Sequence, residues 1–433
     1  MLRFRNALVF ISIALVLCVP FTSTVLSKLG VVFPKWTGIS EPVSYLDGGF
    51  KHGFPQVSAQ TITSGEFQDN LELFLADHVP LRDNAVLAKS MTEHAIIGSM
   101  AFASSYDWYP TYFGSDTFYS DQYDALAPLP ADFDPQINAG LSAFAENLTA
   151  YAQAHQDVNF YIYMVDQFAY SEANPLRDLE DDLPSTREFI TLLQDGTAGL
   201  TNVHVTGIAY TDVGEYLQNY WRSDHHWNNK GALAAYNALA LLASKPLIED
   251  VEFTNLEGII FNGSTARYGR YPVDEIPFDS TFDVSNLEMD IYGELPPSEQ
   301  AMAAEKSPDE EKSTITTPQE IREAYLNSDH DRFDAFYENY YGDVIDTLIT
   351  NKAAGTEQGE ALLVGDSYAS AIQYYIAGQY ETTYVTYELY WESTDTPGEE
   401  PHTLDLHNAR DVYFVANPAD YASLLDRFPE LLR

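Results

Sequence analysis

The sequence predicts an α/β fold in which helices cover both faces of a parallel sheet. Short apolar runs of strand length alternate along the chain with longer segments of helical periodicity. Most of these runs are apolar throughout, as in strands that are buried on both sides. Hydrophobic residues make up 45% of the 433-residue chain, so it can bury a sizeable core, and a wholly disordered chain is excluded.

The first half of the chain begins with a helical segment at 66–100, whose apolar residues recur at helical spacing. Pro80 interrupts this segment because proline has no backbone N–H to donate. Residues 106–119 are rich in aromatic and turn residues, which is compatible with a hairpin. The elements predicted next are an amphipathic helix at 134–156, a strand at 158–165, a helix at 185–193 with Ser185 as its cap, and a strand at 203–208.

The second half of the chain continues this alternation, starting with an Ala/Leu-rich helix at 231–243. Residues 290–318 interrupt it, because they are acidic, rich in Ser and Pro and poor in large apolar residues. We expect most of that stretch to be a disordered insertion. The elements predicted after it are strands at 361–364, 383–390 and 412–415 and helices at 370–378 and 419–432.

The charge and cysteine content of the chain limit its partners and chemistry. Asp and Glu number 65 and Lys and Arg 22, which gives a net charge of −43. Such a protein repels nucleic acid phosphates, so we expect no nucleic acid partner; a neutral glycan, or a charged one screened by salt, is the easier polymer to bind. The single cysteine, Cys18, lies in the N-terminal apolar stretch, which excludes disulfides, zinc–thiolate sites and a cysteine nucleophile from the folded part. We predict no cofactor.

The N-terminus is typical of a targeting segment. Arg3 and Arg5 precede the apolar run at 7–19. Positive charge before such a run keeps the N-terminus on the cytoplasmic side of the membrane and directs the rest of the chain outside. We therefore predict an extracytoplasmic protein of the cell envelope, membrane-anchored or secreted, with a signal peptide or uncleaved signal-anchor at 1–26, a juxtamembrane linker at 27–65 and one folded domain at 66–433.

One candidate for chemistry is the segment Leu-Leu-Val-Gly-Asp-Ser-Tyr-Ala-Ser at 362–370. An apolar strand leads into Gly365, where a side chain would hinder a tight turn, and a helix follows. This arrangement exposes the hydroxyl of Ser367 at the carboxyl end of the strand, beside the free N–H groups of a helix start. The segment therefore has the logic of a nucleophile elbow, although it lacks the Gly-x-Ser-x-Gly pattern.

The other candidate is the segment Ser-Asp-His-His-Trp-Asn-Asn-Lys-Gly at 223–231. In an extended loop, side chains two residues apart point the same way, so we expect Asp224 and His226 to share a face and His225 to point elsewhere. A carboxylate beside an imidazole fixes its tautomer and stabilises the imidazolium after proton transfer. Trp227 is expected to pack behind the loop, and an asparagine at 228 or 229 to cap the next helix.

Three interpretations of these two segments are considered. A Ser-His-Asp hydrolase-type site formed by Ser367, His226 and Asp224 is the one adopted. A metal site competes with it because His and Asp are both ligands, although no third or fourth ligand stands at a recognised spacing. In a purely structural interpretation, Asp366 or Ser367 only caps the helix that follows.

The segment Asp-His-His-Trp at 224–227 resembles the signature of the bacterial DHHW proteins, which are similar to the SGNH-hydrolase-like domains of the alginate O-acetylation proteins AlgX and AlgJ. Its acid, second histidine and tryptophan match the first motif of that group, and Gly-Asp-Ser-Tyr at 365–368 matches the second. Residues 77–82 resemble the group's N-terminal Asp-x-x-Pro-x-Arg segment. Ordinary SGNH esterases place the serine before the histidine, so the motif order here is permuted.

This resemblance extends over about residues 65–430 and implies a flavodoxin-like, SGNH-hydrolase-like domain at 66–433. It implies that Ser367, His226 and Asp224 form the catalytic triad. It also implies an oxyanion asparagine of the SGNH type, for which Asn262, followed by glycine, is the candidate. The residues expected to support the triad are Asp366, Tyr368, His225, Trp227 and Asn262.

The function implied by the resemblance is addition or removal of O-acetyl groups on a cell-surface or exported polysaccharide. Transfer outside the cell requires an acyl donor there, so a membrane O-acyltransferase that supplies acyl groups is an expected partner, with the membrane itself contacted through the N-terminal segment. The alternative is a non-catalytic protein that binds glycan or acts as a scaffold in the cell envelope; a transition-metal hydrolase is third.

Overall fold

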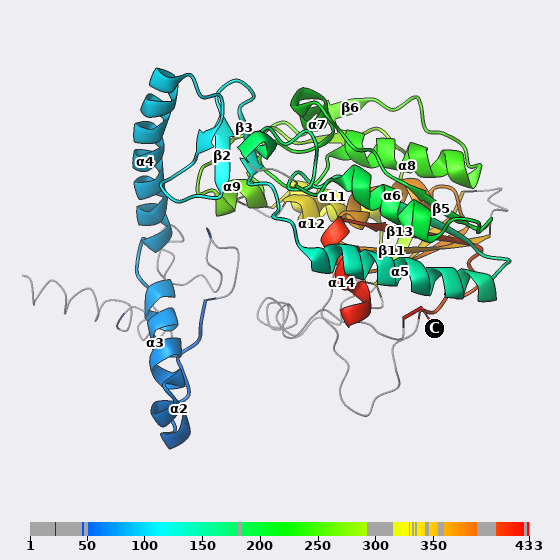
Figure 1. Cartoon of the computed structure of the whole chain (residues 1–433), viewed down its shortest axis with the longest axis horizontal. Coiled ribbons are helices and arrows are strands. Elements are labelled where there is room, and N and C mark those ends of the chain that lie inside the picture. Colours follow the sequence, from blue (N-terminus) through cyan, green and yellow to red (C-terminus); the bar gives the residue numbers. More distant parts are fainter. Residues whose placement is uncertain are drawn as a thin grey trace, which may run out of the picture. The chain divides into compact units, whose positions relative to one another are not determined.

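This computed structural model is built around one large mixed sheet (Figure 1). The chain is divided into two compact units. The first comprises 1–122 and 266–272, and the second comprises 123–265 and 273–433. The second unit contains this sheet and all the predicted site residues. The structure describes residues 22, 46, 51–179, 183–291, 315–328, 330, 333, 336–342, 346–353, 359–387, 404–427 and 431–432.

The central sheet contains eight described strands, of which five are mutually parallel. The remaining three add to the β12 edge of the parallel part as antiparallel neighbours. The α/β fold that the sequence predicts, with helices on both faces of a parallel sheet, is therefore confirmed, and antiparallel strands extend that sheet at one edge. The strands in spatial order are β5 (Val203–Thr206), β4 (Asn159–Met164), β13 (Asp411–Ala416), β11 (Glu360–Gly365), β12 (Thr382–Thr386), β10 (Thr347–Asn351), β8 (Leu287–Ile291) and β9 (Ile315–Thr316).

One face of the parallel part is covered by α5 (Pro135–Ala154), α6 (Thr186–Gly196) and α14 (Pro418–Arg427). Because strand side chains alternate, Phe160 and Ile162 of β4 point into this layer. They join an apolar core in which the Phe144 ring of α5 packs edge-on against Phe414 of β13. In Figure 1, α5 and α14 lie together on the same side of the sheet.

The opposite face is lined by α8 (Asn229–Ala243) and α13 (Ala369–Ala377), which pack against each other and against β4 and β11 respectively. Here the alternate strand residues are tyrosines, and Tyr161 and Tyr413 stack at 5.1 Å. Tyrosine buries a large ring on this face and keeps a polar tip for hydrogen bonding, as in the contact of 2.7 Å between the Tyr380 and Tyr413 hydroxyls.

Most predicted elements of this unit are present within a few residues of their expected ends. Ser185 caps α6 through a capping box with Glu188, and Asn228 caps α8. The antiparallel strands β8, β9 and β10 were not predicted. They are short or alternate between buried and half-buried residues, which is a weaker signal than the continuous apolar runs of the parallel strands.

The predicted disordered insertion at 290–318 needs correction at both ends. Asp290 and Ile291 belong to β8, Ile315 and Thr316 form β9, and Pro318 begins α11 (Pro318–Leu326). These ends are ordered because main-chain hydrogen bonds pair β8 with β10 and β9 with β8, and because Thr317 caps α11. Residues 292–314, the centre of the predicted insertion, lie outside the described residues.

The smaller unit contains α3 (Glu66–Asp77), α4 (Arg82–Ser104) and a hairpin of β1 (Tyr109–Pro110) and β2 (Thr117–Ser120). The break near Pro80 and the hairpin are both as predicted. The predicted linker at 27–65 is wrong in its last part, where α2 (Ala59–Ser64) forms because Ser58 and Thr61 make a capping box.

The predicted signal segment at 1–26 lies outside the described residues except for Thr22. Among the helices that the structure describes, none is both long and apolar enough to cross a membrane. The targeting segment at 1–26 and the single folded domain at 66–433 remain predictions.

Close packing of α5 on α14 provides a test of this fold. A Cβ atom added to Gly140 would lie 2.0 Å from the backbone oxygen of Ala422. Alanine normally stabilises a helix by about 0.5–1 kcal/mol over glycine, but overpacking against backbone costs about 1–3 kcal/mol. We expect Gly140→Ala to lower the free energy of unfolding, measured by denaturant titration.

The matched control for this prediction is Gly53→Ala, because a Cβ there would meet nothing within 4 Å. This variant is expected to change the free energy of unfolding by less than about 0.5 kcal/mol. Equal stability of Gly140→Ala and the unmodified protein would contradict the packing described here.

Candidate functional site

Ser367 lies directly after β11, at the carboxyl end of the parallel strands, and two residues before α13. Its side chain is nearly buried, with 8% of the residue exposed. The turn before it needs glycine, because a Cβ on Gly365 would lie 2.4 Å from the Cβ of Ala369. The Ser367 hydroxyl bonds His226, and among the described hydrogen bonds it accepts none from an N–H of α13, so Ser367 does not cap this helix.

Asp366 stabilises this turn through hydrogen bonds to two neighbouring segments. Its carboxylate accepts hydrogen bonds from the N–H of Tyr368 at 2.9 Å and from the backbone and side-chain N–H groups of Asn417 at 2.8 and 2.9 Å. Burial, followed by repulsion from Asp420, raises the pKa of Asp366 well above its usual range. Asp366 therefore ties the turn after β11 to the end of β13 and does not contact the His226 ring through any hydrogen bond in the described residues.

The histidine segment reaches the same edge of the sheet as a loop between α7 (Val213–Asn219) and α8. An isolated bridge pairs Tyr220 with Trp227, and the N–H of Trp221 donates to the backbone oxygen of His226 at 3.2 Å. The loop is therefore a closed turn. Gly231 permits it to pack tightly, since a Cβ there would lie 2.2 Å from the backbone oxygen of Asn219.

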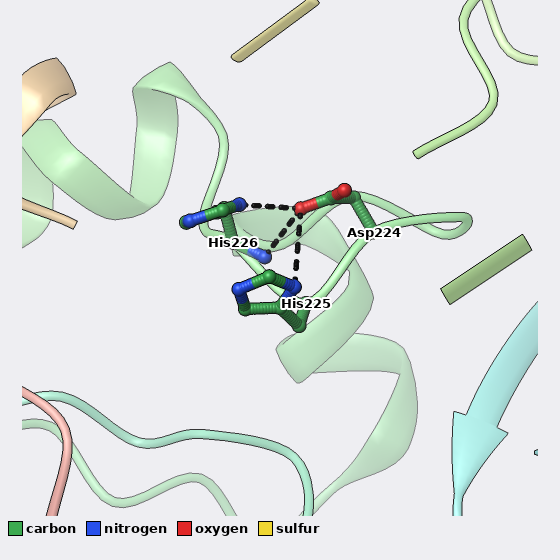
Figure 2. A group of neighbouring side chains, drawn as sticks. All are labelled: Asp224, His225 and His226. Carbon is green, nitrogen blue, oxygen red and sulfur yellow. Dashed lines mark hydrogen bonds and ion pairs between the residues drawn. The ribbon is translucent and has the colours of Figure 1, made fainter. Parts of the chain in front are cut away.

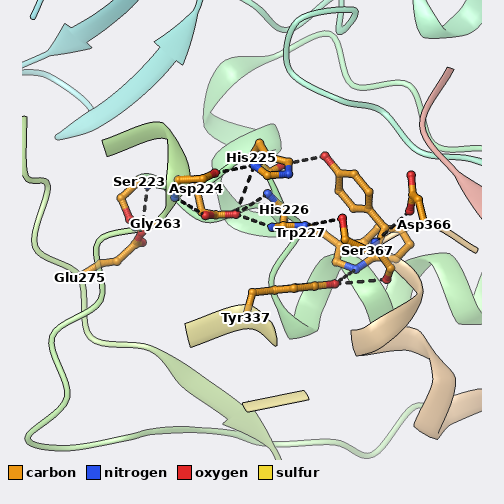
Figure 3. Close-up of polar contacts among 12 residues, drawn as sticks. Ser223, Asp224, His225, His226, Trp227, Gly263, Glu275, Tyr337, Asp366 and Ser367 are labelled. Atoms are coloured by element: carbon orange, nitrogen blue, oxygen red, sulfur yellow. Dashed lines mark hydrogen bonds and ion pairs between the residues drawn. The ribbon is translucent and has the colours of Figure 1, made fainter. Parts of the chain in front are cut away.

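The structure brings Ser367, His226 and Asp224 into one hydrogen-bonded row (Figure 3). His226 Nε2 lies 2.8 Å from Ser367 Oγ, and His226 Nδ1 lies 2.6 Å from Asp224 Oδ1. The imidazole is almost fully buried. With Nδ1 protonated toward the carboxylate, Nε2 is free to accept the serine proton, which is the arrangement that general-base activation of a hydroxyl requires.

Asp224 is held from two sides. Its Oδ1 also accepts the backbone N–H of His226 at 2.9 Å, and its Oδ2 accepts the N–H of Ser264 at 2.6 Å. Gly263 allows this approach, because a Cβ there would lie 2.1 Å from Oδ2. Burial raises the pKa of Asp224, but attraction to His226 and His225 and these hydrogen bonds outweigh it, so the pKa is held below its usual value and the carboxylate stays ionised.

A second buried acid, Glu275, supports the aspartate and was missed from the sequence. It accepts the hydroxyl of Ser223 at 2.5 Å and the N–H groups of Ser223 and Arg222 at 2.9 and 3.2 Å (Figure 3). The Ser223 oxygen in turn accepts the N–H of Gly263 at 3.1 Å. Glu275 therefore joins the two segments that hold Asp224. No motif marks it, since its partners lie about 50 positions away.

Tyr337, in α12 (Phe336–Tyr341), was also missed. Its ring stacks on the His226 ring with a centroid distance of 4.0 Å and an interplanar angle of 6°. Its hydroxyl accepts a hydrogen bond from Trp227 Nε1 at 2.9 Å and donates to the backbone oxygen of Tyr368 at 3.2 Å. Trp227 thus packs behind the loop, as predicted, and Tyr368 donates its own hydroxyl to the backbone oxygen of His225 at 2.7 Å.

The expectation that His225 points away from the pair is wrong. The segment bends here and is not extended, so alternation of side chains fails, and the two imidazoles lie 3.9 Å apart (Figure 2). His225 Nδ1 bonds Ser264 Oγ at 2.6 Å and lies 3.8 Å from Asp224 Oδ1. With its side chain 36% exposed, His225 marks the solvent-facing side of the row.

Asp224, His225 and His226 each place one possible metal-ligand atom within 4.8 Å of the others. The structure therefore brings a third possible ligand, His225, to the pair. The distances fit hydrogen bonds better than an ion. Two atoms bound to zinc at about 2 Å lie about 3 Å or more apart, whereas Asp224 and His226 lie 2.6 Å apart. An ion here would have to break that contact.

Asn262, the candidate oxyanion residue, is fully buried, and its side-chain N–H donates to Asp274 at 2.8 Å. In the described part of the chain, no hydrogen bond joins it to Ser367. Its neighbour Gly263 is the residue that contacts the row, through Asp224. The Asn-Gly pair therefore lies near Asp224, the end of the row away from Ser367.

The comparisons with known proteins concern the fold. No protein-family model matches the sequence, and no curated protein matches it. The structure is similar to the crystal structure of a DHHW family protein from Eubacterium siraeum DSM 15702, with a TM-score of 0.52 and 17% identity over 73% of this chain and 96% of that one. The fold-level resemblance to a DHHW family protein that the motifs predict is confirmed.

Two further solved structures are similar at lower TM-scores. Bacillus cereus PatB1 with a sulfonyl adduct matches with a TM-score of 0.48 and 18% identity over 70% of this chain and 97% of that one. The O-acetyltransferase domain of Pseudomonas putida AlgJ matches with a TM-score of 0.35 and 10% identity over 72% and 90%.

Asp166, which follows β4 at the same edge of the sheet, provides a test of burial there. It accepts hydrogen bonds from Ser171 Oγ at 2.8 Å and the N–H of Tyr210 at 2.9 Å, but burial still raises its pKa to about 6. The folded protein then binds a proton that the unfolded chain releases near pH 4, so stability falls as pH rises through this range. Relative to Asp166→Asn, the unmodified protein should lose about 1.4 kcal/mol of unfolding free energy between pH 5 and pH 7.5.

This prediction concerns the difference between the two proteins, because other groups titrate equally in both. Denaturant titrations at the two pH values measure it. A difference that stays constant with pH would show that the Asp166 carboxyl titrates normally.

Proposed function

We propose that this protein is an extracytoplasmic serine acyltransferase or esterase that adds or removes O-acetyl groups on a cell-surface or exported polysaccharide. The observation that carries the proposal is a pair of hydrogen bonds that join three side chains in a row. Ser367 Oγ lies 2.8 Å from His226 Nε2, and His226 Nδ1 lies 2.6 Å from Asp224 Oδ1. A buried Ser-His-Asp row at the carboxyl end of a parallel sheet is the arrangement used for acyl transfer through an acyl-enzyme.

In the first half of the reaction, Ser367 Oγ attacks the carbonyl carbon of an acyl ester while its proton passes to His226 Nε2. Asp224 keeps Nδ1 protonated and stabilises the imidazolium through the contact at 2.6 Å. The tetrahedral intermediate then expels the alcohol, which takes the proton from Nε2. Ser367 is left acylated and His226 is neutral again, so charge and protons balance.

In the second half, a hydroxyl of the incoming acceptor attacks the acyl-serine and gives its proton to His226 Nε2. Collapse returns this proton to Ser367 and releases the new ester or acid. If the acceptor is a sugar hydroxyl the protein is a transferase, and if it is water the protein is an esterase. The two activities share every residue of the row and differ in what excludes water.

The substrate class is proposed from features outside the triad. The motifs at 224–227 and 365–368 resemble those of polysaccharide O-acetylation proteins. The net charge of −43 favours a neutral glycan or one screened by salt. Transfer outside the cell further requires an acyl donor, and we propose a membrane O-acyltransferase in that role, with residues 1–26 holding the protein at the membrane.

Substitution of the nucleophile tests this proposal. We expect Ser367→Ala to lower release of acetate from a chromogenic acetyl ester by about 10⁴-fold, since it removes the hydroxyl that forms the acyl-enzyme. Ser423→Ala is a matched control, because Ser423 lies in α14 and its hydroxyl bonds the backbone oxygens of Ala419 and Asp420 within that helix. It should retain full activity.

Undiminished activity of Ser367→Ala would remove Ser367 from the mechanism. A protein that hydrolyses no ester and transfers no acetyl group to oligosaccharides, but still binds glycan, would instead support the non-catalytic envelope module. Parallel measurement of acetate release and acetylated oligosaccharide separates esterase from transferase.

A further inference from the structure

The face of the His226 imidazole is covered on one side by Tyr337. The two rings are almost parallel, at 6°, with centroids 4.0 Å apart, and Tyr337 is fully buried in the first turn of α12 (Figure 3). His225 lies over His226 at a centroid distance of 3.9 Å and tilts by 36°, and Tyr368 approaches it at 5.0 Å and 59°. Of these three neighbouring rings, that of Tyr337 is the most nearly parallel to the imidazole.

An aromatic face carries partial negative charge and attracts a cation placed over it. The effect is larger when water is excluded, and both His226 and Tyr337 are buried. The charged groups that face this imidazole are Asp224 at its edge and, when protonated, His225. Stacking on Tyr337 therefore favours the imidazolium over the neutral ring, in the same direction as Asp224 and against a protonated His225.

The hydroxyl of Tyr337 has a separate role. It accepts a hydrogen bond from Trp227, the neighbour of His226, and donates one to the backbone oxygen of Tyr368, the neighbour of Ser367. One side chain thus connects the segment of the base with the segment of the nucleophile. These segments lie more than 100 positions apart in the chain and meet at the hydrogen bond between His226 and Ser367.

We propose that Tyr337 is a positioning residue of this site, whose ring stabilises the imidazolium form of His226 and whose hydroxyl holds the base against the nucleophile. The inference rests on the proposed function in one respect, namely that His226 accepts the proton of Ser367. It assigns the two parts of one side chain to two separable effects.

Two variants separate these effects. Tyr337→Leu removes ring and hydroxyl, so the pH at which the rate of ester hydrolysis is half-maximal on its acid side should fall by about one unit. Tyr337→Phe removes only the hydroxyl, so it should lower kcat about tenfold, as expected for a lost hydrogen bond that orients the base, and leave this pH midpoint unchanged.

The control is Tyr341→Leu, which removes a tyrosine that is equally buried one turn further along α12. Its ring packs edge-on against Tyr337 at 5.2 Å, and among the ring contacts of the described residues none joins it to His226. The pH midpoint of this variant should equal that of the unmodified protein. An equal fall in Tyr341→Leu would overturn the inference, because general loosening of α12 would then explain the effect.

A second readout does not depend on catalysis. The NMR resonance of the Cε1–H of His226 is followed against pH in the unmodified protein and the variants, with Tyr337→Leu expected to titrate about one pH unit lower. If this shift occurs in a protein without acyl chemistry, the proposed function fails and the role of the ring stands. If ester hydrolysis is normal but neither midpoint moves, or either rises, the role of Tyr337 is overturned.

Discussion

The hydrogen bond of 2.8 Å between Ser367 and His226 is the contact on which the candidate site depends, and it joins residues 141 positions apart. Nothing local in the chain can produce it. Parallel strands place their carboxyl ends along one edge of a sheet, and the turn after β11 and the loop before α8 both reach that edge. The sheet therefore brings Ser367 and His226 within hydrogen-bonding distance.

The buried acids Asp366 and Glu275 at this edge are held by hydrogen bonds, and Glu275 also has a cationic partner, Arg222, at 3.6 Å. Asp366 joins the turn that carries Ser367 to the end of β13, and Glu275, through Ser223, joins the loop that carries Asp224 to the segment around Gly263. Unpaired acids would be costly to bury, so each accepts three or more N–H or O–H donors. Burial still raises the pKa of Asp366 and of Glu275. The pKa of Asp224 is lowered instead, because His226 and His225 lie beside it.

The sequence predicts what depends on strong local patterns. Continuous apolar runs predict the parallel strands, and two short motifs predict Asp224, His226 and Ser367 as neighbours. Patterns fail where tertiary contacts decide. His225 packs on His226 because the loop bends, and the antiparallel edge strands carry weak alternation. Tyr337 contacts Trp227 across 110 positions, in a short aromatic helix that no motif distinguishes from ordinary core.

The most direct test of the central claim is covalent labelling by a fluorophosphonate, followed by identification of the labelled peptide by mass spectrometry. Such a probe reacts with a serine whose hydroxyl is activated by a base. The account predicts a single adduct on Ser367, formed much more slowly when His226 is replaced by alanine in a protein that remains folded. Labelling of Ser367 at an unchanged rate without His226, or an adduct only on another serine, would contradict it.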